Sequence, residues 1–223
     1  MAKLIINADD FGLSKKFNQT IIKLLEERKI TSTTVMVDRI SDYQEVQVQH
    51  LKYLMRDSEI SVGLHVEFTY DRHLEQVKNQ FEKFSRIFDQ TPSHLDIHKE
   101  HLHTNYHEVV AGFCKEQQLP FRNHGTVYDG VSTTCKKYFF GTLDSFNPID
   151  AWLRDLEPAQ YSELVFHPGT YDPVCPSSLN KERERDIEHI QRIFENMETY
   201  QINPVSFNQL VQNNLKPRNC SQG

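Results

Sequence analysis

Short apolar runs alternate with amphipathic helical patterns along most of this chain. Strand-like runs are predicted at residues 3–8, 32–37, 60–66, 93–97 and 164–166. Between them, apolar residues recur three or four positions apart, as on one face of a helix, most clearly over residues 17–25, 74–88 and 187–197. This alternation predicts an α/β fold with a parallel sheet and helices packed outside it. Periodicity alone does not separate an open doubly wound sheet from a barrel.

The composition predicts one globular domain. The chain has 223 residues, of which 38% are hydrophobic, enough for one core. No linker, repeat or low-complexity tract divides it, so we expect a single domain over residues 1–213 and a polar tail over residues 214–223. The net charge is −6, whereas nucleic-acid-binding proteins usually carry a basic surface, so we expect no nucleic-acid partner. With no apolar stretch of membrane-spanning length and four widely separated cysteines, we expect a cytoplasmic protein with no membrane partner.

Ionisable side chains stand where several predicted strands end. Asp9 and Asp10 close the first strand, His65 closes the third, and a histidine cluster follows the fourth. His167 ends a late strand and is followed by Pro168-Gly169. Because the carboxyl ends of parallel strands meet on one side of an α/β sheet, these residues are predicted to share one pocket.

The adjacent carboxylates of Asp9 and Asp10 are costly to place together without a cation. On an extended chain, neighbouring side chains point to opposite faces, so one carboxylate can bind a metal while the other lies nearby without binding it. The alternative is that the pair supplies a turn and an N-cap for the first helix, for which Ser14 is also a candidate.

The histidine cluster favours a metal site. His94, Asp96 and His98 recur at every second position, so on a strand they would share a face, and His101-Leu102-His103 follows. Imidazole with carboxylate is a common ligand set for zinc-like ions. A solvated histidine-rich loop is the alternative, and His65 alone could be a core histidine. His167, held at a turn, could titrate near neutral pH and act as a general acid.

Other chemistries lack their motifs. The chain has no G-x-S-x-G elbow, no phosphate-binding P-loop and no dinucleotide-binding glycine pattern. The cysteines show no spacing typical of a thiol nucleophile. Metal-assisted chemistry remains.

These motifs, in their order, resemble one known family. They are residues 6–14 (I-N-A-D-D-F-G-L-S), residues 31–34 (T-S-T-T), Gly63-Leu64-His65, residues 94–98 (H-L-D-I-H), His167-Pro168-Gly169 and residues 177–185. The resemblance is to the YdjC-like carbohydrate deacetylases, which include chitooligosaccharide deacetylases, and it extends over about residues 3–207. It implies a distorted, incomplete (β/α) TIM-like barrel and removal of N-acetyl groups from amino sugars with one divalent cation.

The resemblance also implies roles for individual residues. Asp10, His65 and His98 would hold the metal, zinc or magnesium, with manganese or cobalt as alternatives. Asp9 would be the general base and His167 the general acid, while His101 and His103 are predicted to contact the substrate. The expected partner is a small N-acetylated carbohydrate, and a homodimer is left open.

The sequence departs from the family pattern in two places. Lys99-Glu100 separate His98 from His101-Leu102-His103, and the segment after His65 is short, which should open the pocket. A sugar nucleotide, a surface-glycan precursor or another N-acyl compound is therefore an alternative substrate. Two other functions stay open. One is hydrolysis of an ester or phosphoester, for which Lys99, Arg122 and Arg72 could bind phosphate. The other is metal or sugar binding without catalysis.

Overall fold

The computed structural model describes residues 1–69, 71–140 and 143–213, so the predicted tail over residues 214–223 lies outside the described residues. Its strands form one parallel sheet in the order β4-β3-β2-β1-β6-β5, and β7 also pairs with β1. The strands are β1 (Ala2–Phe11), β2 (Ser32–Val35), β3 (Ser61–Val66), β4 (Leu95–Ile97), β5 (Lys136–Phe140), β6 (Tyr161–Phe166) and β7 (Ile202–Pro204).

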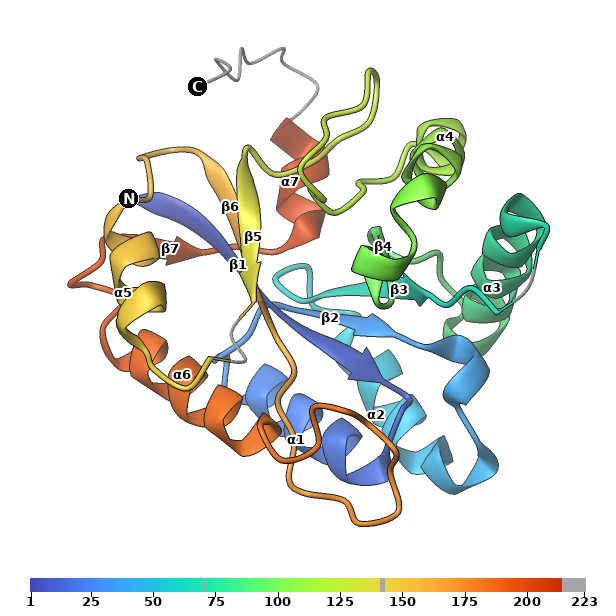
Figure 1. Ribbon diagram of the computed structural model, residues 1–223, viewed down its shortest axis with the longest axis horizontal. Coiled ribbons are helices and arrows are strands. Elements are labelled where there is room, and N and C mark those ends of the chain that lie inside the picture. The colour runs from blue at the N-terminus through green and yellow to red at the C-terminus, as the bar shows by residue number, and fades with distance from the viewer. Residues whose placement is uncertain (70, 141–142, 214–223) are drawn as a thin grey trace.

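Helices surround the curled sheet (Figure 1). They are α1 (Lys15–Glu26), α2 (Glu45–Leu54), α3 (His73–Phe88), α4 (His107–Gln117), α5 (Asn147–Arg154), α6 (Arg183–Glu195) and α7 (Phe207–Asn213). At the outer edge of β4, a β-bridge joins Leu95 to Phe121. Across the described ranges no strand ladder joins this edge to β5, so the sheet curls without closing. The predicted α/β class and incomplete TIM-like barrel are confirmed.

Strand β1 is the centre of the sheet. It pairs with β6 along one edge, and along the other edge with β7 near its start and β2 near its end. Leu4, Ile5 and Ile6 are fully buried, as expected of a parallel strand covered on both faces. The strand is longer than the predicted run, because it continues through Asp9 and Asp10 to Phe11. Both carboxylates are thereby carried on the central strand.

The first helix begins as predicted. Ser14 is its N-cap, and the Ser14 Oγ accepts a hydrogen bond from the backbone N–H of Lys16 at 3.1 Å. Phe17, Ile21 and Leu25 are fully buried against the core. The cap fixes where the chain turns after β1, and Asp10 therefore lies at the carboxyl end of this strand.

Some short elements were not predicted from periodicity. No periodic pattern predicted α5, β7 or α7, which the structure contains. β7 has three residues and includes Pro204, too few for a period of two to show. Among the described residues, no helix combines the length and apolar character needed to cross a membrane.

Candidate active site

The ends of β1, β3, β4 and β6 meet at a cavity of about 510 Å³. Its lining includes Asp9, Asp10, His65, His98 and His167. With His101, the chain thus brings six of the seven predicted site residues to one cavity, as expected for the carboxyl edge of a parallel sheet.

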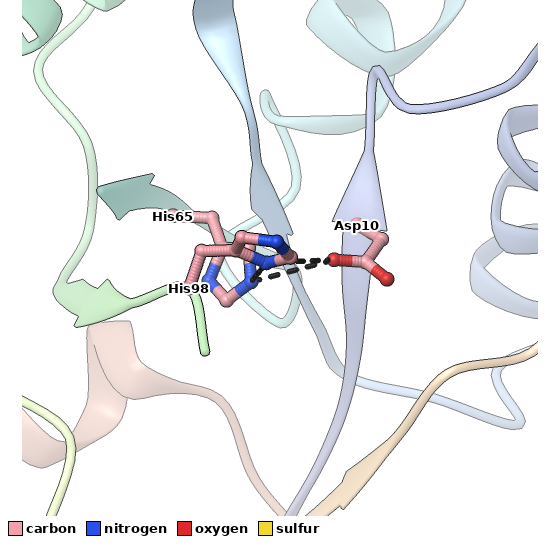
Figure 2. Close-up of side chains that lie close together, drawn as sticks. All are labelled: Asp10, His65 and His98. Carbon is pink, nitrogen blue, oxygen red and sulfur yellow. Dashed lines mark hydrogen bonds and ion pairs between the residues drawn. The ribbon is translucent and has the colours of Figure 1, made fainter. Parts of the chain in front are cut away.

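Asp10, His65 and His98 point toward one another (Figure 2). The Asp10 Oδ1 lies 3.4 Å from His65 Nε2 and 3.4 Å from His98 Nδ1, and the two ring nitrogens are 3.1 Å apart. All three residues come from different strand ends. Despite this crowding, the buried Asp10 Oδ1 has no hydrogen-bond partner among residues 1–69, 71–140 and 143–213. A carboxylate and two imidazoles aimed at one point are a donor set that fits a divalent cation.

Neighbouring groups fix these three donors in place. The His65 Nδ1 lies 2.7 Å from Asp96 Oδ1, which leaves the Nε2 lone pair facing Asp10 when Nδ1 carries the proton. The fully buried Arg183 donates from Nη2 to Asp10 Oδ2 at 2.5 Å. One oxygen of Asp10 is therefore held by a guanidinium and the other faces the histidines.

The electrostatics of the cluster favour positive charge. Burial would raise the pKa of Asp10, but its contacts with His65 and His98 and the charge of Arg183 outweigh burial and hold that pKa well below its usual value. Burial would lower the pKa of His65, but the carboxylates of Asp96 and Asp9 outweigh it and hold that pKa well above its usual value. The pocket thus stabilises a cation at this point.

Asp9 and Asp10 do not lie on opposite sides of the sheet as the extended-chain argument expected. Both line the cavity. The reason is local: Asp10 has a φ of 73°, in the left-handed region, and the register with β2 shifts between Ala8 and Phe11. This backbone turn brings the second carboxylate to the same side as the first.

Asp9 is held by donors on nearly every side. Its Oδ1 accepts hydrogen bonds from Asn7 Nδ2 and Thr34 Oγ1, each at 2.7 Å. Arg122 adds a bidentate contact at 2.9 Å to each carboxylate oxygen. Burial would raise the pKa of Asp9, but Arg122 and the neighbouring histidines lower it below its usual value. Asp9 therefore stays a carboxylate, with Oδ2 the less encumbered oxygen.

His167 faces Asp9. The His167 Nε2 lies 3.8 Å from Asp9 Oδ2. Its backbone N–H donates to Asp186 Oδ2 at 2.7 Å, and its carbonyl accepts from Arg183 Nη1 at 3.4 Å. Burial lowers the pKa of His167, and the carboxylates of Asp10 and Asp9 offset only part of this effect. The ring is thus placed by its backbone and by the turn that follows.

The rest of the histidine cluster divides between the site and the core. His94 is buried and stacks on Phe207 with ring centroids 3.6 Å apart, so it does not share a site with Asp96 and His98 as its spacing predicted. Strand β4 is Leu95–Ile97, so His94 lies just outside it and the alternation of strand faces does not extend to His94. His101 lines the cavity. His103 is outside the lining and packs against Phe68 and Tyr106.

Sequence reasoning missed several buried charges around the site. Arg122 was considered only as a phosphate ligand, whereas it contacts the carboxylates of Asp9, Asp96 and Glu163. An acidic residue inside an apolar strand, as Glu163 is in β6, is a signal of such a network. Arg183 lies in the motif of residues 177–185, which indicated only the family resemblance and no contact with Asp10. Asp186 carries no signal, because it stands in a run of charged residues at the start of α6.

Comparisons with known proteins place this geometry in context. Residues 3–79 match the family model described as YdjC-like protein. The chain is 29% identical to a carbohydrate deacetylase of Clostridium beijerinckii, over 79% of this chain and 85% of the relative. It is also 29% identical to a chitooligosaccharide deacetylase of Yersinia pestis, over 78% of this chain and 85% of the relative.

Two solved structures share the fold. One is a protein of Enterococcus faecalis V583 to which cellobiose-phosphate cleavage has been ascribed, with a TM-score of 0.73 and 22% identity over 94% of this chain and 98% of that one. The other is a family 4 acetyl xylan esterase of Clostridium thermocellum in complex with a cobalt ion, with a TM-score of 0.58 and 11% identity over 96% and 93% of the two chains. The sequence comparisons confirm that this chain resembles the YdjC-like carbohydrate deacetylases over most of its length.

Proposed function

We propose that this protein is a metal-dependent hydrolase that removes N-acetyl groups from an amino sugar or a related carbohydrate. The observation that carries the proposal is the convergence of Asp10, His65 and His98 in the cavity that also holds Asp9 and His167. The names of the relatives, carbohydrate deacetylase and chitooligosaccharide deacetylase, support the substrate class.

Asp10, His65 and His98 would hold the cation. When bound, a divalent ion would polarise the acetyl carbonyl and acidify a water molecule. Imidazole ligands suit zinc, while cobalt, manganese and magnesium are the alternatives, and a structure with the same fold holds cobalt.

Asp9 would act as the general base through Oδ2. Its Oδ1 already accepts hydrogen bonds from Asn7, Thr34 and Arg122, whereas Oδ2 accepts from Arg122 and faces His167. Asp9 would take a proton from the attacking water as the water oxygen bonds to the acetyl carbon. The lowered pKa keeps Asp9 ionised and ready for this step, and Arg122 fixes its orientation.

His167 would act as the general acid. As the bond between the acetyl carbon and the amide nitrogen breaks, His167 would give the proton on Nε2 to the departing nitrogen, leaving acetate and a free amine. Burial lowers the pKa of His167, which makes its protonated form a stronger donor but a scarcer one. The two carboxylates beside it partly restore the protonated form.

The charged residues of the cavity favour an acyl group over a phosphoryl group. Arg122 is engaged with three carboxylates, and Arg39 is held by Glu67 through two hydrogen bonds at 2.9 and 2.5 Å. Arg72 is not among the lining residues, whereas Lys99 is. Phosphoester hydrolysis normally uses several free cations around the phosphate. The cavity volume, about 510 Å³, is in the ordinary range for a small-molecule site.

The test is acetate release from a panel of N-acetylated mono-, di- and oligosaccharides and sugar nucleotides. Protein stripped of metal is assayed alone and after return of zinc, cobalt, manganese or magnesium. We expect activity only with metal returned. Two variants separate the roles: Asp10→Asn should lose activity and the ion held by Asp10, His65 and His98, whereas Asp9→Asn should keep that ion and lose activity.

Asp38→Asn is the matched control, because Asp38 is exposed and lies outside the cavity lining. Full activity in Asp9→Asn would refute the role of Asp9 as the general base. No acetate from any substrate, with metal measured in the protein, would overturn deacetylation and favour a different ester or a binding role.

A further inference from the structure

A second group of side chains of the types that bind metals includes two residues of the same cavity lining. Glu100, at the start of the 3₁₀ turn Glu100–Leu102, approaches His107 at the start of α4 and His124, which follows the Phe121 bridge. The His107 Nε2 is 3.6 Å from Glu100 Oε1, and the two imidazole centroids are 4.9 Å apart. One ligand atom from each residue falls within 4.8 Å of the other two.

His107 is the observation that points to a ligand. It is 6% exposed, and its Nε2 has no hydrogen-bond partner among the residues that the structure describes. A buried polar nitrogen without a partner is costly, so native proteins rarely leave one. The contact with Glu100 is too long for a hydrogen bond. The nitrogen nevertheless points at a carboxylate, as a ligand to a shared ion would.

An ordinary ion pair between Glu100 and a protonated histidine explains the group less well. Burial lowers the pKa of His107, and the Glu100 carboxylate opposes this only in part. Burial and the charge of Arg122 lower the pKa of His124 well below its usual value. Burial therefore disfavours the protonated form of both rings.

The surroundings are those of a site with an open face. Phe121 packs behind both rings, with its centroid 5.0 Å from His124 and 6.4 Å from His107. Glu100 and His124 also line the cavity that holds Asp9 and Asp10. Lys99 has a φ of 50°, so the backbone turns sharply just before Glu100. The Lys99-Glu100 pair, which departs from the family pattern, is thus what delivers the carboxylate to the two imidazoles.

We propose that Glu100, His107 and His124 form a second metal site, which takes Zn²⁺ or a similar transition-metal ion and leaves a coordination position open toward the cavity. Two imidazoles and one carboxylate suit such ions better than Mg²⁺ or Ca²⁺. Ligands held at about 2.0–2.2 Å around a tetrahedral ion lie roughly 3.3 Å apart. The Glu100–His107 separation of 3.6 Å is already close to this spacing, and the three ligand atoms, which lie within 4.8 Å of one another, would have to approach by at most about 1.5 Å.

The position suggests what this ion would do. It would tie the loop after β4 and the start of α4 to the segment after Phe121, at the edge where the sheet stays open. It would also offer a ligand position to a substrate oxygen at the rim of the cavity. The proposal does not depend on deacetylation, because the three residues are separate from Asp10, His65 and His98.

The test counts metal ions. Metal-free protein is loaded with Zn²⁺, passed through a desalting column and measured by elemental analysis, and the count is repeated with Co²⁺, whose visible absorption reports its ligands. We expect two ions per chain in the unmodified protein. His107→Gln and Glu100→Gln should each lose one ion and keep the other, whereas Asp10→Asn should lose the other ion alone.

Glu108→Gln is the matched control, because Glu108 is an exposed neighbour on α4 and should keep both ions. Glu100 is partly exposed, so its variant tests the site without disturbing the core, and circular dichroism checks that each variant folds. If His107→Gln and Glu100→Gln bind as many ions as the unmodified protein, the second site is refuted. If Asp10→Asn leaves the ion count unchanged while His107→Gln and Glu100→Gln each lower it, the site at Asp10, His65 and His98 is refuted and the second site stands.

Discussion

Asp186 is a buried carboxyl group whose protonation should control the stability of this protein near neutral pH. Burial raises its pKa to about 7, although the backbone N–H of His167 and the charge of Arg183 act in the opposite direction. The His167 N–H donates to Oδ2, while the buried Oδ1 has no hydrogen-bond partner within the described residues. The neutral acid is therefore favoured in the folded protein.

The direction of the pH effect follows from this shift. In the unfolded chain Asp186 has its usual pKa of 3.8. Between that value and about 7, the folded protein holds a proton that the unfolded chain has released, so the free energy of unfolding falls as pH rises through this range. The full difference is about 4 kcal/mol, because each tenfold change in proton affinity is worth about 1.4 kcal/mol. Above about pH 7 the effect levels off.

The perturbation is Asp186→Asn, which keeps an oxygen for the His167 N–H and removes the titration. Urea unfolding should show that the free energy of unfolding falls less between pH 5 and pH 8 in the variant than in the unmodified protein. At pH 8 the variant should be the more stable of the two, by up to about 4 kcal/mol. Burial also raises the pKa of Glu163 to about 7, so the difference between the two proteins isolates Asp186. Glu188→Gln, exposed on the same helix, is the control. An equal pH dependence in the variant and the unmodified protein would refute the reasoning.

Two further changes probe the network and the core. Arg122→Gln leaves the buried carboxylates of Asp9 and Asp96 without their cation. It should lower the free energy of unfolding, measured by urea titration, by on the order of 3–5 kcal/mol. A loss below about 1 kcal/mol would contradict the role of Arg122 as the cation of this buried network. Gly63→Ala would place a Cβ in steric conflict with the His94 ring and should lower the free energy of unfolding by about 1–3 kcal/mol. Gly112→Ala, with nothing within 4 Å of its Cβ, should instead leave thermal stability unchanged or raised, and equal effects of the two alanines would rule out the steric explanation.

The elements with strong periodicity could be predicted from the sequence. The apolar run that became β1, the Ser14 cap and the α1 stripe are all set by neighbours within a few residues. The meeting of strand ends at one cavity followed from the geometry of parallel sheets. Short elements such as β7 depend on distant partners and carry no local pattern.

The finer arrangement of the site depends on contacts that no local pattern encodes. The position of Arg122 among three carboxylates joins segments far apart in the chain. The left-handed backbone at Asp10 overrode the alternation of a regular strand. His94 stacks on Phe207 from α7, a partner that its own motif gives no reason to expect. The roles given to the site residues stay predictions.

The pairing of β1 also determines the order in which the sheet can be completed. Asn7 pairs with Ser32 close by in the chain, but Leu4 pairs with Ser162 on one side and with Pro204 on the other. During synthesis, the half of the sheet from β1 to β4 can assemble from local units, while the other edge of β1 waits for the last third of the chain. Until then an apolar, unpaired strand edge is open to other chains. Its late closure makes this edge the point at which folding competes with aggregation.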